Sequence, residues 1–261
     1  MSPDWQRLFP AKDHRFQMGL RVGDARTFWT DQEGPEVRQE RQRWLRETPG
    51  LYTAELLEGR EGMQEARAWI QQWTPACEAD WVVLSEGVDE EPRVLGGEVV
   101  FPSSWSLPEK LGQPLSSVHG PVPGLGDELG KAIQVFLSRI QPASAWEREN
   151  WGLAADAELN HHPALSRPRL DETARLHTTW IRLERQFLTR LSVTRGLLFG
   201  IRVSCHRLEE VAVLPGVADG LTRSLETMSE AVVEYKGLRL ARESLLRELR
   251  AISPDASGNA P

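Results

Sequence analysis

The chain of 261 residues has only two cysteines, Cys77 and Cys205, and no excess of basic residues. The cysteines are far apart and form no Cys-x-x-Cys spacing, so neither an iron–sulfur cluster nor a thiolate-held structural zinc is expected. A disulfide stays open, although nothing in the sequence requires one. The net charge of −7 argues against general nucleic-acid binding, because basic side chains are needed to neutralise phosphates.

Long apolar runs are missing too, and no apolar segment follows a basic start. The sequence therefore predicts no membrane span and no secretory signal, and it favours the cytoplasm. It also lacks a Walker phosphate loop, a Gly-x-Ser-x-Gly motif and a Gly-x-Gly-x-x-Gly motif after a strand, so kinases, hydrolases and dinucleotide-dependent dehydrogenases have no support. Tryptophan, in contrast, is abundant, with ten residues against two tyrosines. This excess fits a protein that encloses an aromatic ligand, and equally a tryptophan-rich core.

The pattern of apolar residues predicts helices and strands in a mixed order. Residues 1–33 and 157–174 read as irregular, and the expected helices cover 35–48, 62–74, 128–140 (with Asp127 as the N-cap), 217–234 and 238–251. Strands are expected at 81–85, 93–101, 150–156, 177–188 and 196–204. This order favours an α+β fold, an antiparallel sheet with helices packed on it. We expect one domain over residues 1–252 and a disordered tail over 253–261.

His119 lies in the segment Ser117-Val-His-Gly-Pro-Val-Pro123. Pro121 and Pro123 each fix φ and remove an N–H donor, and they push the residues before them toward extended geometry. We therefore expect a rigid, non-helical mount that aims the imidazole in one direction, as a metal or haem ligand requires. A structural histidine is the alternative.

Two polar stretches are further candidates. Strand alternation puts Arg182, Glu184 and Gln186 on one face and Arg185 on the other, and Arg202 could join the first face if the next strand pairs there. This face is either solvated or the wall of a polar pocket. The run Arg148-Glu-Asn-Trp151 is either a surface loop or a second polar wall, where the guanidinium could clamp a carboxylate or donate to bound oxygen.

Several motifs occur together in one order along the chain. They are Met18-Gly-Leu20, Phe101-Pro-Ser-Ser-Trp105, Glu109-Lys-Leu-Gly112, Val118-His-Gly-Pro-Val-Pro123, Arg148-Glu-Asn-Trp151, Arg182-Leu-Glu-Arg-Gln186, Arg190-Leu191, Phe199-Gly-Ile-Arg202 and Tyr235-Lys-Gly237. This set resembles the haem-dependent oxidative N-demethylase family, whose haem-binding alpha subunit has a PAS-like fold. The resemblance implies a PAS-like antiparallel sheet with flanking helices and a helical C-terminal extension.

The resemblance also implies haem b and a monooxygenase activity. The substrate would be a small methylated secondary amine such as dimethylamine, which is converted with O2 to a shorter amine and formaldehyde. Electrons would come from NADPH through a partner reductase with flavin and iron–sulfur centres. A haem-based PAS gas or redox sensor and a haem-free scaffold are the alternatives; the presence of His119 argues against the scaffold.

Carried over by position, the resemblance makes His119 the axial iron ligand. Glu184, Arg148 and Asn150 become candidates for catalysis, with the Glu184 carboxylate facing a cationic amine and an arginine donating to bound oxygen. The candidates for holding the haem, including its propionates, are Arg185, Lys110, Trp151, Gln186 and Arg202.

Overall fold

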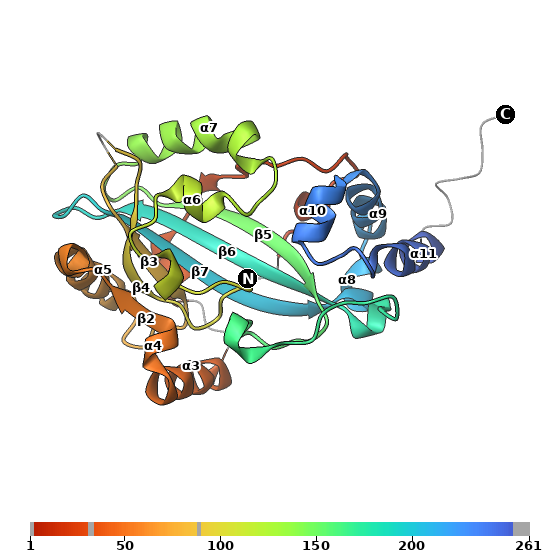
Figure 1. Cartoon of the computed structure of the whole chain (residues 1–261), viewed down its shortest axis with the longest axis horizontal. Coiled ribbons are helices and arrows are strands. Elements are labelled where there is room, and N and C mark those ends of the chain that lie inside the picture. Colours follow the sequence, from red (N-terminus) through yellow and green to blue (C-terminus); the bar gives the residue numbers. More distant parts are fainter. Residues whose placement is uncertain (1–2, 31–33, 88–89, 253–261) are drawn as a thin grey trace.

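The computed structural model describes residues 3–30, 34–87 and 90–252. Its centre is a seven-stranded sheet in the order β1-β5-β6-β7-β3-β4-β2, and all pairings are antiparallel (Figure 1). The strands are β1 (Arg21–Val22), β2 (Thr53–Glu55), β3 (Asp80–Leu84), β4 (Val94–Glu98), β5 (Trp146–Ala154), β6 (Trp180–Arg190) and β7 (Leu197–Arg207). The predicted α+β fold with an antiparallel sheet is confirmed.

The long strands β5, β6 and β7 form a continuous meander. β6 and β7 agree with the strands expected at 177–188 and 196–204, whereas β5 begins at Trp146, ahead of the strand expected at 150–156. Arg148 and Asn150 therefore belong to a strand and not to a surface loop. In the register of β5 and β6, Arg148 lies opposite Gln186 and Asn150 lies opposite Glu184. All four side chains therefore share one face of the sheet.

The face of the sheet that carries Glu184, called here the first face, is covered by α6 (Leu115–His119) and α7 (Leu125–Arg139), as Figure 1 shows. Leu137 of α7 is buried against Leu188 and Leu197. Helix α7 begins before the expected N-cap at Asp127, because Gly124 adopts a left-handed conformation (φ 78°) that starts the helix there. The expectation of a non-helical mount for His119 is wrong, since His119 is the last residue of α6.

Lower on the same face lie α3 (Pro35–Glu47) and α4 (Pro49–Tyr52). Helix α3 is anchored by Arg41, whose guanidinium is buried and bonds Asp80 at the start of β3 and Glu98 at the end of β4. Asp80 also accepts the backbone N–H groups of Val100 and Phe101, at 2.7 and 2.8 Å. The buried charges therefore fix both the helix and the chain that leaves β4.

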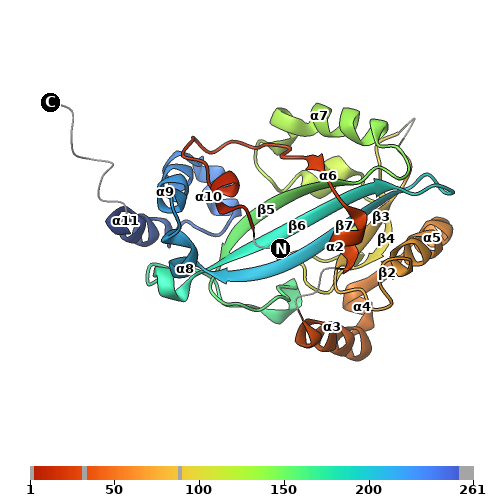
Figure 2. The same ribbon diagram turned by 180° about the vertical axis from the view of Figure 1, so that it is seen from behind.

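The opposite face carries α2 (Ala25–Thr30), visible across the sheet in Figure 2, and α5 (Arg60–Gln71). Phe28 and Trp29 of α2 approach so closely that a Cβ on Gly200 would lie 2.8 and 2.9 Å from them. A glycine is therefore needed at this position of β7. The helices expected at 35–48 and 62–74 are confirmed as α3 and α5, with small shifts at their ends.

The C-terminal helices pack around a separate apolar cluster together with α1 (Trp5–Leu8). They are α8 (Leu208–Ala212), α9 (Val217–Thr227), α10 (Glu230–Tyr235) and α11 (Arg242–Ile252). The expected helix over 217–234 is divided, because Ser229 interrupts it and caps α10 by accepting the Val232 N–H. The predicted disorder of 253–261 lies outside the described residues.

Short 3-10 turns complete the described chain: η1 (Leu57–Gly59), η2 (Pro108–Lys110), η3 (Pro163–Leu165) and η4 (Leu176–Thr178). Cys77 and Cys205 are free thiols. Within the described ranges, none of the helices is long and apolar enough to cross a membrane.

Candidate functional site

Glu184 is the centre of a polar cluster on the first face of the sheet. Its Oε1 accepts the hydroxyl of Ser103 at 2.5 Å, and its Oε2 accepts the side-chain amides of Gln186 at 2.9 Å and Asn150 at 3.4 Å. Glu184 is half-buried. A carboxylate held by several donors has a fixed orientation, which suits it to bind a cation.

Arg148 lies beside Glu184 and is incompletely paired. Burial lowers the pKa of the Arg148 guanidinium, an effect that the Glu184 carboxylate opposes. Its Nε is buried and has no hydrogen-bond partner among the residues that the structure describes. Because an unsatisfied buried donor is costly, this nitrogen is suited to an acceptor supplied by a ligand.

His119 lies between this polar face and a cavity. Burial and the charge of Arg148 lower the pKa of His119, while Glu91 opposes them, so the imidazole is neutral at pH 7. The structure shows no hydrogen bond from the ring to any described residue. Neutral imidazole is the form that ligates iron.

The cavity next to His119 has a volume of about 680 Å³ and runs between α6 and α7. Apolar side chains of both helices line it, among them Leu115, Ile133 and Leu137, with Glu91 and Lys131 as charged members. This is within the size range of small-molecule and cofactor pockets. Arg148 and Glu184 are not part of its wall, so His119 is the contact between the cavity and the polar face.

Lys236, directly after α10, brings a second buried cation near Glu184. Its Nζ donates to the carbonyl of Trp151 at 2.9 Å and lies 5.0 Å from the centre of the Trp151 ring. Burial lowers the pKa of Lys236 to about 8, and the Glu184 carboxylate opposes this shift. The neighbouring Tyr235 phenol has a raised pKa through burial and the same carboxylate. Glu184 thus accepts hydrogen bonds from β5, β6 and the chain after β4, and the charge of Lys236 lies near it.

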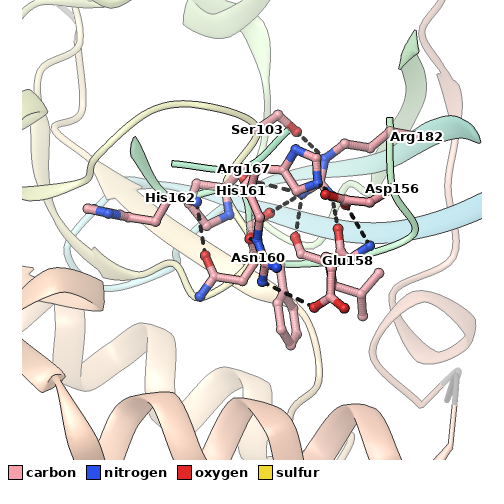
Figure 3. A network of polar contacts seen from close by, with 11 residues as sticks. Ser103, Asp156, Glu158, Asn160, His161, His162, Arg167 and Arg182 are labelled. Carbon is pink, nitrogen blue, oxygen red and sulfur yellow. Dashed lines mark hydrogen bonds and ion pairs between the residues drawn. The ribbon is translucent and has the colours of Figure 1, made fainter. Parts of the chain in front are cut away.

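The buried Arg182 side chain holds Ser103, a member of the Glu184 cluster, in place. Its Nε donates to Ser103 Oγ at 2.8 Å, and its Nη atoms donate to the carbonyls of Phe101 and Leu159, at 2.8 and 2.6 Å. Figure 3 shows Ser103 and Arg182 beside the network that includes His161 and Asp156. Arg182 therefore joins two distant loops to the strand that carries Glu184.

Two arginines expected at the site lie elsewhere. The register pairs Arg202 with Arg185, on the face opposite Glu184, so the expectation that Arg202 shares that polar face is wrong. Arg185 pairs with Glu147 at 3.5 Å, and Arg202 pairs with Glu78 at 3.4 Å. Strand alternation already separates Arg185 from Glu184. The position of Arg202 depended on the register, which the sequence leaves open.

Two further candidates for holding the haem, Trp151 and Lys110, do not join the Glu184 cluster either. Trp151 faces the C-terminal helices, where its ring packs against Phe9 with centroids 5.0 Å apart. Lys110 lies in η2, and no contact joins its side chain to Glu184 within the described residues. Two contributors, Ser103 and Lys236, received no role from the sequence, although both lie inside the motifs that carry the family resemblance.

The described part of the chain contains no group of three or more His, Cys, Asp or Glu side chains that could hold a metal ion. A haem iron needs one axial imidazole instead. A half-buried histidine, an adjoining cavity and a carboxylate near two cationic side chains are features of a cofactor-binding site. The chain matches the model of the haem-dependent oxidative N-demethylase, alpha subunit-like family over residues 36–246. It belongs to this family, and haem is its cofactor.

The described residues fit a haem. His119 has an open ring nitrogen beside the cavity, and Arg148 offers a buried Nε–H that a propionate or another acceptor could complete. Arg185 and Arg202 are already engaged with carboxylates on the other face, which leaves Arg148 and Lys236 as the buried cations near Glu184.

Proposed function

We propose that this chain binds haem through His119 and removes a methyl group from a small secondary amine such as dimethylamine. The balanced reaction takes the amine, O2, two electrons and two protons to the shorter amine, formaldehyde and water. The bound haem supplies the activation of O2. The electrons come from a separate reductase that draws on NADPH.

The observation that carries this proposal is the Glu184 cluster, a fixed carboxylate whose charge acts on Arg148, which in turn acts on His119 at the wall of the cavity between α6 and α7. A methylated amine is protonated at neutral pH, so it needs a compensating negative charge in a partly desolvated site. Glu184 provides this charge and orients the N–H bond of the cation. Arg148, whose charge acts on His119, is suited to an anionic or oxygen acceptor.

A haem-based sensor is the second candidate, and the cavity with its single histidine fits it equally. The Glu184 cluster favours the demethylase, because a sensor of neutral gases has no need for a fixed anion. The two functions differ in one measurable respect, the response of the haem to amines.

The test is the absorption spectrum of the haem-loaded protein during titration with dimethylamine. We expect a Soret band that the amine shifts in wild type and that His119→Ala changes or abolishes. Exposed His177 provides the matched control, since His177→Ala should leave the spectrum as it is.

Glu184→Gln separates the amine from the cofactor. We expect it to keep its haem content and weaken amine binding by about tenfold or more, because the hydrogen bond loses its ionised partner. Loss of haem in this variant would assign Glu184 a structural role. A Soret band that ignores amines in wild type would favour the sensor.

A further inference from the structure

The hydrogen bonds around Ser103 have a fixed direction. Arg182 has only N–H donors, so at Ser103 Oγ it must donate, at 2.8 Å. The single hydroxyl proton of Ser103 is then directed to Glu184 Oε1, 2.5 Å away. Arg182 cannot turn, because its other nitrogens are held by the backbone carbonyls of Phe101, Pro102, Glu158 and Leu159.

The acceptor positions of Glu184 are nearly all occupied. A carboxylate offers about four lone-pair positions on its two oxygens. Oε2 accepts from both Gln186 and Asn150, and Oε1 accepts from Ser103. The cluster therefore leaves one position, on Oε1, for an incoming donor.

We infer that Ser103, oriented by Arg182, is a positioning residue that leaves Glu184 one acceptor position, so that the site selects ammonium ions carrying at least one N–H. This inference rests on the proposed function and refines its substrate class. Dimethylammonium and trimethylammonium each have an N–H to donate. Tetramethylammonium has the same charge but no N–H, and it leaves the Oε1 position empty.

The experiment measures the affinity of haem-loaded protein for these three ions, from the Soret band and from saturation-transfer NMR of the N-methyl protons. In wild type, we expect dimethylammonium and trimethylammonium to bind at least about tenfold more tightly than tetramethylammonium, the value of one charge-assisted hydrogen bond. Ser103→Ala should weaken dimethylammonium by about tenfold and reduce the preference over tetramethylammonium. Ser103→Thr, which keeps the hydroxyl, should restore the affinity for dimethylammonium and the preference over tetramethylammonium.

Ser104→Ala is the matched control, because Ser104 is the exposed neighbour on the same loop and its hydroxyl has no part in the cluster. Equal affinity for all three ions in wild type would overturn the inference and leave the demethylase proposal standing. A Ser103→Ala variant with unchanged haem content and unchanged selectivity among the three ions would also overturn the inference and leave the demethylase proposal standing. If wild type takes up haem but binds no methylated ammonium ion, both the inference and the proposed function are overturned.

Discussion

Replacing Lys236 with methionine should stabilise the protein at neutral pH. The Lys236 ammonium is buried against Trp151, with one backbone carbonyl as its hydrogen-bond acceptor and Glu184 as the nearby counter-charge. Burial penalises the charged form, and this penalty is present whenever the folded protein holds the proton. Methionine has a similar length and no charge, so it can occupy the same space against the Trp151 ring.

The size of the effect follows from the pKa of Lys236, which falls from an ordinary 10.5 to about 8. At 1.36 kcal/mol per pH unit, the folded state bears a penalty of about 3 kcal/mol at pH 7. Removing the hydrogen bond to the Trp151 carbonyl offsets about 1 kcal/mol. We therefore expect Lys236→Met to raise the free energy of unfolding by about 2 kcal/mol at pH 7.

The pH dependence gives the sharper test. Between pH 8 and 10.5 the unfolded chain binds the Lys236 proton and the folded chain does not, so wild-type stability relative to Lys236→Met must rise with pH in this window. Urea unfolding at several pH values, followed for both proteins, measures the difference. Lys12→Met, at an exposed lysine, is the control. A variant that is less stable at pH 7, or a difference that does not change with pH, would refute the reasoning.

Two further predictions concern the charges of Lys236 and Glu184 and the buried ion pair between Arg41 of α3 and Asp80 of β3. The affinity for dimethylammonium should rise as the pH passes through about 8, because Lys236 then loses the positive charge that competes for Glu184; Lys236→Met should abolish this rise in Soret titrations at pH 7 and 9. Asp80→Ala should lower the free energy of unfolding by about 3–5 kcal/mol, because it leaves the Arg41 guanidinium buried without its main partner. Urea unfolding of Asp80→Ala beside Asp80→Asn checks this, and a loss below about 1 kcal/mol would contradict it.

The strands β6 and β7 are predictable from the sequence because apolar residues recur there with a period of two, as at Leu197, Phe199, Ile201 and Val203. The start of β5 could not be predicted in this way. In Trp146-Glu-Arg-Glu-Asn150, polar residues point to both faces, and Glu149 finds its partner in Arg21, 128 residues away in the chain. Only the tertiary pairing makes a strand of this run.

The error at His119 has a local cause. Residues 115–119 contain no proline and are free to form α6, and even Gly120, directly before Pro121, keeps a helical backbone (φ −50°, ψ −36°). The roles of Ser103 and Lys236 lacked any local signal, because their partners Glu184 and Trp151 are 81 and 85 residues away. Alternation along β6 correctly grouped Arg182 with Glu184, but it could not show that Arg182 serves backbone carbonyls and not a ligand.

Arg148 differs from Arg185 and Arg202 in its charge partners, and this difference marks it as a candidate contact for a ligand. On the face of α2, Arg185 and Arg202 each have a carboxylate partner, Glu147 and Glu78. On the face of α6, the buried Nε of Arg148 finds no acceptor within the described parts of the chain. A buried charge without full pairing costs stability. A bound molecule that completes the pairing of Arg148, near His119 and Glu184, should therefore stabilise the fold, so that ligand binding and stability are coupled at this residue.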